Sequence, residues 1–351
     1  MAGERDRSRT RELLERLSES DLDCDSLRLE AIAELERTVG FDRWCWPLAD
    51  PETLLPLSGL AEHDFGPAVP RSLELEYSGS DYAAKNFLAR RPDAAGSLNA
   101  ETSGDLARSP RWDEVMRPTG IGDIAAVACR DGLGCWGWIE AYRDSADRPF
   151  EEHDLELLAA IGPCLGSALR RSVMTAATGT IAPPSDPGML VLDHSLRLVS
   201  WTASARAWID ALPSAWLFAA WGMLPSVIYP AATLARSTDA GRSHALLRTA
   251  DGRWVMIEAA RLEGEREGEI AVDLRSATAA ETFQLLCRVY ALSAREREVV
   301  AALVAGLDTG GVAQRLSISA YTVQDHLKSV FAKTGIHSRR ELLVTLGSPA
   351  P

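Results

Sequence analysis

The sequence lacks the features that mark a membrane protein, a secreted protein or a metalloprotein. No run of residues approaches the roughly 20 consecutive apolar positions that a helix needs to cross a bilayer. The first 24 residues are rich in Arg, Glu and Asp and contain no apolar stretch typical of a signal peptide. The six cysteines are scattered, without the CxxC or Cys/His spacing of a zinc site. These absences predict a cytoplasmic protein with reduced cysteines, no membrane partner and no bound metal.

The motifs of several large enzyme classes are also missing. The chain has no GxxxxGK[ST] phosphate loop, no GxSxG nucleophile elbow, no HExxH helix and no GxGxxG after a predicted strand. An early acidic cluster with a matching lysine, as in a phosphate-accepting receiver domain, is not found either. We therefore expect a protein that is not an enzyme and that carries no cofactor.

Basic residues are in short supply over most of the chain but not at its C-terminal end. With 37 Lys and Arg against 50 Asp and Glu, the net charge is −13, which disfavours binding to nucleic-acid phosphates. From Arg288 onward, eight basic residues stand against five acidic ones, whereas the preceding residues hold 29 against 45. The C-terminal segment, with a net charge of +3, is therefore the candidate nucleic-acid binder.

Two breaks in the sequence pattern divide the chain. The stretch TAATGTIAPPSDPG, from Thr175 to Gly188, is rich in small residues, Pro and Gly, which is typical of an interdomain connector. A second break lies near Ala291, where one helical pattern ends and a new helix start follows. The length suits several domains, and these breaks predict three.

The last segment contains the clearest helical pattern. Ser293 lies three residues before Glu296, which is the spacing of a capping box, and Gly306 stands where the helix would end. Thr309 can cap a short second helix, and the three-residue turn 317–319 leads to a third. Two helices joined by so tight a turn predict a helix-turn-helix.

The helix after this turn has two contrasting faces. Its apolar positions recur at helical spacing, at Val323, Leu327, Val330 and Phe331. The opposite face carries Tyr321, Gln324, Asp325 and Lys328. In helix-turn-helix proteins the N-terminal half of the second helix enters the major groove of DNA. These four side chains are therefore placed where a DNA reader would need them.

The segment resembles the LuxR-type (GerE-type) helix-turn-helix family over about 60 residues. The matching stretches are LSAREREVV, GGVAQRLSISAYTVQDHLKSVFAKTG and HSRRELL, and the family's run of Thr, Val, two variable residues, His and Leu stands at 322–327. The chain departs from the family at Gly310 and Gly311, where bulkier helix formers are usual, and at the acidic Asp325. The resemblance implies binding to double-stranded DNA and a fourth helix that forms dimer contacts, hence an inverted-repeat site. The dimer contacts are expected from Leu342, Leu343 and Leu346.

The exposed side chains of the third helix offer chemistry for reading bases. Lys328 can donate to guanine, Gln324 can pair with adenine, and Asp325 can only accept, from a cytosine amine. These three are the predicted base-reading residues. Phosphate contacts are predicted for Thr322, Lys333, Arg339 and Arg340. The alternative is that each is a solvated surface residue, and His326 is expected to pack rather than to bind.

The first segment alternates helical and strand patterns. We predict a helix at 26–38, strands at 42–50 and 53–59, a hairpin at 124–143 and a long helix at 151–172. This order, with SPRW at 109–112 and WGW at 136–138, resembles the GAF-like sensors that precede LuxR-type domains. The resemblance implies an α+β sensor domain.

Two pairs of tryptophans alternate at strand spacing in this segment: Trp44 with Trp46, and Trp136 with Trp138. Each pair would project onto one sheet face and could line a pocket for a flat or cationic ligand, with Asp42 or Glu140 as a polar handle. The alternative is that the indoles only fill the core of the sheet, as aromatic pairs usually do.

The middle segment begins with two apolar strands around a polar turn, continues with helices and ends with a strand meander. This pattern resembles a PAS-like fold, although the helical part, with three tryptophans, departs from common PAS spacing. His194 lies in a predicted turn and His244 at a predicted strand start, so neither is expected to anchor haem or flavin. A ligand-free signalling or dimerisation module is an equal alternative.

Together these patterns predict a multidomain fold with an α+β GAF-like sensor, an α+β PAS-like domain and an all-α, four-helix LuxR-type helix-turn-helix. The expected parts are a polar N-terminal segment (1–24), the sensor (25–174), a linker (175–187), the PAS-like domain (188–276), a connecting helix (277–290) and the helix-turn-helix (291–351). We expect a bacterial transcriptional regulator that binds an inverted repeat as a homodimer, under control of a small ligand or protein signal, with RNA polymerase as a further candidate partner. The alternative is an interaction scaffold or ligand-binding module whose helix-turn-helix mainly dimerises and reads no sequence.

Overall fold

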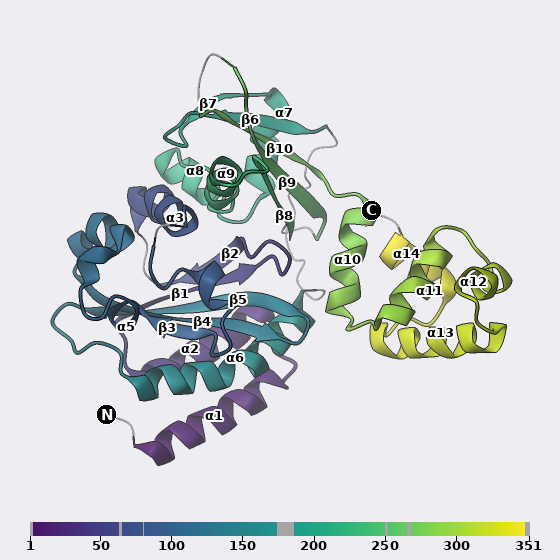
Figure 1. Ribbon diagram of the computed structural model, residues 1–351, viewed down its shortest axis with the longest axis horizontal. Helices are drawn as coiled ribbons and strands as arrows, with labels where there is room; N and C mark the ends of the chain where they lie inside the picture. Colours follow the sequence, from purple (N-terminus) through teal and green to yellow (C-terminus); the bar gives the residue numbers. More distant parts are fainter. Residues whose placement is uncertain are drawn as a thin grey trace. The chain divides into compact units, whose positions relative to one another are not determined.

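The computed structural model describes residues 3–62, 65–79, 81–173, 186–249, 252–264 and 268–347. The chain forms two compact units, Met1–Arg275 and Ser276–Pro351. The first unit contains two five-stranded antiparallel sheets, and the second, where described, consists of helices (Figure 1). An α+β region followed by a helical segment is what the sequence predicts, so this coarse fold class is confirmed. Within the described ranges, every helix is too short or too polar to cross a membrane.

The first sheet has the strand order β2-β1-β5-β4-β3. Its strands are β1 (Arg43–Ala49), β2 (Pro56–Ala61), β3 (Ala95–Ser97), β4 (Ile121–Asp131) and β5 (Gly134–Asp144). The central strands β4 and β5 are buried along most of their length, because other elements cover both faces. They therefore read as continuous apolar runs rather than as alternating patterns.

Helices α2 (Cys24–Val39) and α6 (Glu152–Ser172) cover one face of the first sheet, and α1 (Glu4–Ser18) packs on these two helices (Figure 1). Helix α6 lies close to β4 because two of its residues have no side chain. A Cβ atom at Gly166 would lie only 2.6 Å from the backbone nitrogen of Arg130, and one at Gly162 would lie 2.8 Å from the carbonyl oxygen of Ala128. Larger residues at these two positions would push the helix away from the sheet.

The N-terminal segment, expected only as a polar stretch, forms helix α1. Leu14 is fully buried, and the Thr10 hydroxyl lies 2.7 Å from the Thr38 hydroxyl of α2. Most of the other positions of α1 are charged, so its narrow buried stripe gives a weak periodic signal in the sequence.

Short elements cover the opposite face of the first sheet. They are η1 (Gly66–Ala68), α3 (Val69–Tyr77), α4 (Lys85–Leu88), α5 (Leu98–Glu101), η2 (Leu106–Arg108), η3 (Trp112–Met116) and η4 (Arg117–Thr119). Leu75 of α3 and Met116 of η3 share a buried cluster with Ile124 and Tyr142 of the sheet. This face therefore has its own apolar core.

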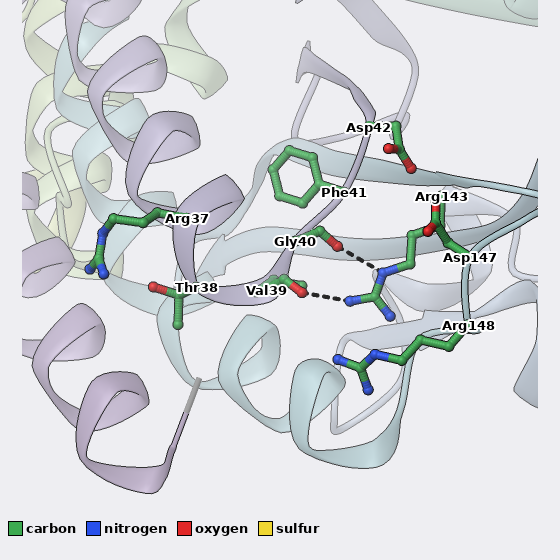
Figure 2. Close-up of a pocket in the computed structure, with 9 residues that line it drawn as sticks. All are labelled: Arg37, Thr38, Val39, Gly40, Phe41, Asp42, Arg143, Asp147 and Arg148. Atoms are coloured by element: carbon green, nitrogen blue, oxygen red, sulfur yellow. Dashed lines mark hydrogen bonds between the residues drawn. The ribbon is translucent and has the colours of Figure 1, made fainter. Parts of the chain in front are cut away.

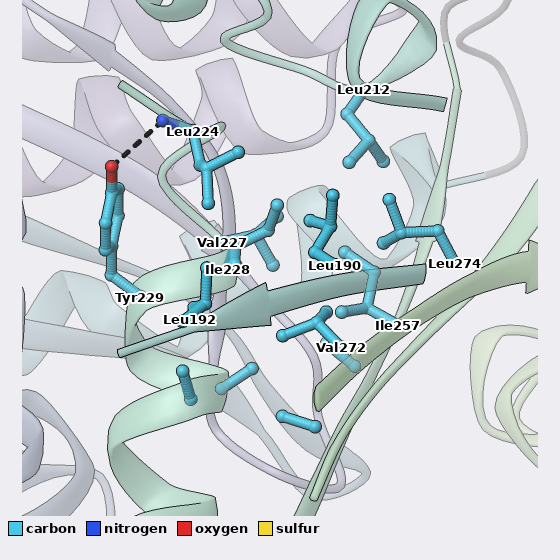
Figure 3. Packing of buried hydrophobic residues seen from close by; sticks show 14 of the residues in the cluster. Leu190, Leu192, Leu212, Leu224, Val227, Ile228, Tyr229, Ile257, Val272 and Leu274 are labelled. Carbon is cyan, nitrogen blue, oxygen red and sulfur yellow. Dashed lines mark hydrogen bonds between the residues drawn. The ribbon is translucent and has the colours of Figure 1, made fainter. Parts of the chain in front are cut away.

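The second sheet has the strand order β7-β6-β10-β9-β8. If the strands of each sheet are numbered along the chain from its own first strand, both sheets have the order 2-1-5-4-3. Its strands are β6 (Gly188–Leu192), β7 (Leu198–Trp201), β8 (Arg242–Arg248), β9 (Trp254–Arg261) and β10 (Ile270–Ser276), and its helices are α7 (Ala203–Ala211), α8 (Trp216–Trp221) and α9 (Ile228–Ser237). Leucine, isoleucine and valine side chains from the sheet and from α9 form a continuous core (Figure 3).

Residues from the first sheet region complete the core of the second. Leu55 and Tyr77 are buried members of that core, although they precede β6 by more than a hundred residues. Glu74 of α3 also accepts a 2.6 Å hydrogen bond from Arg236 of α9, and the buried Asp50 carboxylate accepts one of 2.8 Å from the Leu246 backbone. These contacts join the two sheets into one compact unit.

The second unit contains α10 (Ala279–Val289), α11 (Ala294–Val304), α12 (Thr309–Leu316), α13 (Ala320–Thr334) and α14 (Arg339–Gly347). The predicted connecting helix at 277–290 corresponds to α10, which contacts α14 within this unit. The predicted linker at 175–187 lies almost wholly outside the described residues.

Candidate functional site

Helix α11 begins with the capping box that its sequence predicts. The Ser293 hydroxyl accepts from the Glu296 backbone at 3.3 Å, and the Glu296 carboxylate accepts from the Ser293 backbone at 2.6 Å. Helix α12 begins one residue differently from expectation, since Asp308 rather than Thr309 is its cap and accepts from the Gly311 backbone at 2.7 Å. An aspartate at this position adds a negative charge next to the partial positive charge of the helix start.

The turn between α12 and α13 is short and closely defined. Ser317 ends α12 in the left-handed conformation, with φ at +55°, and the Ser319 hydroxyl accepts from the Thr322 backbone at 3.0 Å to start α13. Ser319 is thus the cap of α13. The Thr322 hydroxyl lies 2.8 Å from the same Ser319 hydroxyl, so this side chain takes part in the cap as well.

Helix α13 has a buried face and an exposed face, as its periodicity predicts. Val323, Leu327 and Val330 are buried against α11 and α12. On the other side the proposed base readers Gln324, Asp325 and Lys328 are exposed and lie on one stripe with Tyr321, which is 73% exposed. His326 is half-buried, in keeping with a packing residue.

The contacts among these exposed side chains are weak. Lys328 lies 3.4 Å from the Asp325 carboxylate, and the Gln324 amide donates to the Thr309 hydroxyl at 3.4 Å. Exposed pairs of this kind contribute little to stability, typically 0 to about 1 kcal/mol. All three side chains can therefore exchange these contacts for a ligand at small cost.

Lys333, one of the predicted phosphate contacts, ties α13 to the start of α11. Its ammonium donates to the buried Glu296 carboxylate at 2.6 Å and to the Ala291 carbonyl at 3.2 Å, and Ser329 donates to Glu296 at 2.5 Å. Burial by itself would raise the pKa of Glu296, but the hydrogen bonds from Lys333, Ser329 and Ser293 outweigh it and lower the pKa to about 2. The ionised Glu296 carboxylate thus links helices α11 and α13.

The residues around α14 divide between interior and surface. Arg339 donates to the Leu307 carbonyl at 2.5 Å, whereas Arg340 is exposed. Leu342 and Leu346, two of the three predicted dimer contacts, are 0% and 1% exposed, and α14 packs on α10 and α11 of the same chain. Their side chains fill the interior of the unit, and only Leu343 of the three is partly exposed.

Comparison with known proteins identifies this helical arrangement. Residues 290–346 match the family described as bacterial regulatory proteins, luxR family. Over 59 residues the chain is 41% identical to a monoamine regulon transcriptional regulator of Klebsiella aerogenes, and this match covers 17% of the chain and 26% of that protein. The C-terminal unit therefore contains a LuxR-type helix-turn-helix, a type of domain that binds DNA. Such a domain suggests a transcriptional regulator.

The structure places the four tryptophans of the suggested ligand pocket in the interior of the first sheet, but on both of its faces. Trp44 pairs with Ala141 across the sheet and Cys45 with Glu140, so Trp44 and Glu140 point to opposite sides. Trp46 shares the face of Trp44, because both lie on β1 two residues apart. Two indoles of the predicted set therefore point away from the proposed polar handle Glu140.

The second tryptophan pair is split by a β-bulge. The register between β4 and β5 shifts at Trp136, whose indole donates to Asp131 at 3.0 Å, while Trp138 keeps the face of Glu140. The buried indole nitrogens of Trp46 and Trp138 have no hydrogen-bond partner in the described part of the chain. The four tryptophans thus do not converge on a single point.

A cluster of five buried charged side chains lies on the face of the first sheet that Glu140 occupies. We call it the charge cluster, and it consists of Glu76, Asp81, Lys85, Arg111 and Glu140, each with a side chain at most 5% exposed. The Lys85 ammonium lies 2.5 Å from Glu76 and 3.0 Å from Glu140, and Arg111 lies 3.0 Å from Glu76 and 2.9 Å from Asp81. Sequence reasoning singled out Glu140 as a polar handle and included Arg111 only as part of the SPRW motif at 109–112. The four members of the cluster other than Glu140 lie in or between short elements that give no periodic signal.

Neighbouring charges hold Glu140 and Lys85 of the cluster in their ionised forms. Burial alone would raise the pKa of Glu140, but Lys85 and Arg111 outweigh it and lower the pKa to about 2. Burial alone would lower the pKa of Lys85, but Glu140 and Glu76 outweigh it and raise the pKa. Glu140 and Lys85 therefore stay charged across the physiological pH range.

A polar pocket of about 400 Å³ lies between the end of α2 and the loop after β5 (Figure 2). Arg143 forms one wall and donates to the carbonyls of Gly40 at 2.7 Å and Val39 at 2.6 Å. Asp42, the other suggested polar handle, lines this pocket and accepts from the Asp144 backbone at 2.9 Å. No tryptophan is among the residues that line it.

Proposed function

We propose that the protein is a sequence-specific DNA-binding transcriptional regulator. The observation that carries this proposal is the exposed stripe of α13, which presents a carboxylate, an amide and an ammonium on the second helix of a LuxR-type helix-turn-helix. A helix needs only mixed charge to stay solvated. A helix that reads bases also needs hydrogen-bonding groups on one face of its N-terminal half, and α13 has such groups there.

In this proposal Gln324, Asp325 and Lys328 read base edges in the major groove. Arg340 is exposed and Thr322 stands at the helix start, and both positions suit phosphate contacts that fix the register of the domain. Lys333 and Arg339 are engaged in the internal hydrogen bonds described above, so only their remaining N–H groups are available to a phosphate. We expect their role in the fold to outweigh their role in binding.

We further propose that two copies bind an inverted repeat, since a two-fold symmetric pair of reader helices matches a two-fold symmetric site. RNA polymerase is the natural further partner of such a regulator. The first unit is proposed to hold a GAF-like and a PAS-like module that receive a small ligand or protein signal. The shared strand order of the two sheets supports this assignment. The charge cluster, on the face of the first sheet that Glu140 occupies, supports it as well.

Selection of randomised inverted repeats by the purified protein tests the proposed function. Asp325→Ala should relax the preference at one base pair per half-site by about 1 to 3 kcal/mol, because an acceptor for a cytosine amine is lost. Lys328→Ala should either remove one guanine preference or, if the ammonium holds phosphate, weaken binding to all sequences and lower the salt slope by about one per site.

Arg11→Ala provides the control, because Arg11 is an exposed arginine of α1, paired with Glu15, and its loss removes one positive charge far from the reader helix in sequence. It should leave both the selected motif and the salt slope unchanged. The scaffold alternative holds instead if the wild-type protein selects no motif. The reader face is only a solvated surface if the protein selects a motif that neither α13 variant alters.

A further inference from the structure

An uncharged stretch of unusual length lies in the second sheet region. Between Asp210 and Arg236 there are 25 consecutive residues without a charged side chain, in a chain that is 25% charged. Helix α9, at the end of this stretch, is buried in the core of the second sheet. Helix α8 lies in the first half of the stretch and is not buried in this way. Four of its six residues are exposed, and all six are apolar.

Helix α8 is firmly held in the structure. Leu212 before it, Leu217 within it and Leu224 after it are all buried, and the Leu224 backbone donates to the Tyr229 hydroxyl at 2.9 Å (Figure 3). The Arg206 guanidinium of α7 also lies 4.6 Å from the centre of the Phe218 ring. The outward face of α8 is therefore presented by a fixed framework.

That outward face consists of Trp216, Ala219, Ala220 and Trp221. Trp216 is 55% exposed and Trp221 is 41% exposed, and their rings pack edge to face with centres 5.5 Å apart. Exposed aromatic side chains on a rigid, uncharged helix are costly in water, and tryptophan is enriched among the residues that dominate binding at protein interfaces. The exposed face of α8 has the composition of an interface centre.

The charge of the chain favours a second copy as the occupant. Two copies with a net charge of −13 repel one another over most of their surface, so they approach most easily where a patch carries no charge. A nucleic acid or an anionic lipid surface would find no basic group between residues 211 and 235, and Arg206, which lies against α8, is already paired with Asp210. In addition, Leu342 and Leu346 are buried in the interior of the C-terminal unit, so only Leu343 of the three predicted dimer contacts is partly exposed and further contacts would strengthen the pairing of two copies.

We propose that the exposed face of α8 is a self-association surface, through which two copies of this chain meet about a two-fold axis with Trp216 and Trp221 at the centre. This assignment rests on the proposed function in one respect, since that function requires two copies. One short helix covers much less than the roughly 800 Å² per partner of a standard interface, so we expect a weak dimer that forms only at micromolar protein concentrations. Binding of both copies to one DNA site raises their effective concentration and completes the pairing.

Sedimentation velocity of the full chain without DNA tests the proposal, over a range from low to high micromolar protein. The wild type should shift from monomer to dimer with rising concentration, and Trp216→Ser combined with Trp221→Ser should remain monomeric throughout. Phe87→Ser is the matched control: it removes an aromatic side chain that is 58% exposed elsewhere in the same unit, and it should dimerise as the wild type does. Ala220→Glu adds a charge to the face without removing a ring and should also be monomeric. This variant tests the proposal even if the double tryptophan variant fails to fold.

A wild type that stays monomeric at every concentration overturns the proposal, as does an Ala220→Glu variant that dimerises like the wild type. Flotation with uncharged phosphatidylcholine vesicles identifies the main competing occupant. A monomeric wild type that floats only while Trp216 and Trp221 are present would assign α8 to a lipid surface instead. Because no measurement involves DNA, the result is independent of whether α13 reads sequence.

Discussion

Lys85 shows how strongly a single buried charge depends on its partners. Its ammonium lies between the carboxylates of Glu76 and Glu140, and all three side chains are at most 5% exposed. A buried ion pair adds little net stability compared with an apolar core, because removing its charges from water is costly. Loss of one partner is a different matter, since the remaining charges then lie buried without compensation.

Lys85→Met should therefore destabilise the protein by about 3 to 5 kcal/mol, although methionine is similar in length and more apolar. Urea unfolding of the full chain, followed by tryptophan fluorescence, measures this change. Arg11→Met removes a charge from an exposed pair with Glu15 and should cost less than about 1 kcal/mol. Equal stability of Lys85→Met and wild type would mean that water reaches the charge cluster and replaces the ammonium.

At the scale of secondary-structure elements, Glu296 holds the helix-turn-helix together. It caps α11 and receives hydrogen bonds from Ser329 and Lys333 on α13, so one carboxylate links two helices. Its pKa is about 2, against an ordinary value of 4.5. Because the folded state has the lower pKa, the unfolded chain takes up this proton first as the pH falls. The stabilisation is complete above about pH 5 and is lost as the pH falls from 4.5 towards 2.

Glu296→Gln should lower the stability of the C-terminal unit by about 1 to 2 kcal/mol at pH 7, as expected for charged hydrogen bonds near solvent. The difference from wild type should shrink below pH 4 and vanish near pH 2. Thermal unfolding across this pH range, followed by circular dichroism at the helix band, provides the measurement. Glu298→Gln, on the same helix in an exposed pair with Arg295, should show no such pH-dependent difference. A pH-independent difference for Glu296→Gln would show that the carboxylate acts through packing alone.

Elements with a strong local signal could be predicted from the sequence. The capping box at Ser293, the exposed polar stripe of α13 and the hairpin of β4 and β5 all follow from patterns within one or two elements. The charge cluster could not be predicted, because Glu76, Lys85 and Arg111 meet only when three short elements cover one sheet face. The interior position of Leu342 and Leu346 depends on α10, and no pattern within α14 distinguishes a face that packs on the same chain from one that packs on a second copy.

At the scale of the whole molecule, charge is divided unequally between the two units. The C-terminal unit, from Ser276, holds eight basic and six acidic residues, while the full chain has a net charge of −13. Binding to DNA without sequence preference is largely electrostatic and therefore depends on this sum. The acidic residues of the first unit repel phosphate, so we expect them to weaken binding to DNA without sequence preference.

A fragment of residues 276–351 should accordingly bind random-sequence DNA more tightly than the full chain at low salt. Fluorescence anisotropy at two salt concentrations measures both affinities, and the difference should narrow as salt screens the long-range repulsion. The two proteins are compared in the same oligomeric state, with circular dichroism to confirm that the fragment is helical. Tighter binding by the full chain would indicate that the first unit contributes contacts to DNA.

Helix α3 places successive residues in two different cores: Glu76 belongs to the charge cluster of the first sheet, and Tyr77 to the apolar core of the second. The second sheet is therefore not an independent domain, even though the two sheets share one strand order. A chimaera cut between residues 173 and 186 would leave the second sheet without Leu55 and Tyr77, and its core would be open at that point. Replacing the second sheet by another module would therefore require matching changes in α3 and at Leu55. Part of what makes the two sheets one folding unit thus lies in the side chains of a single nine-residue helix.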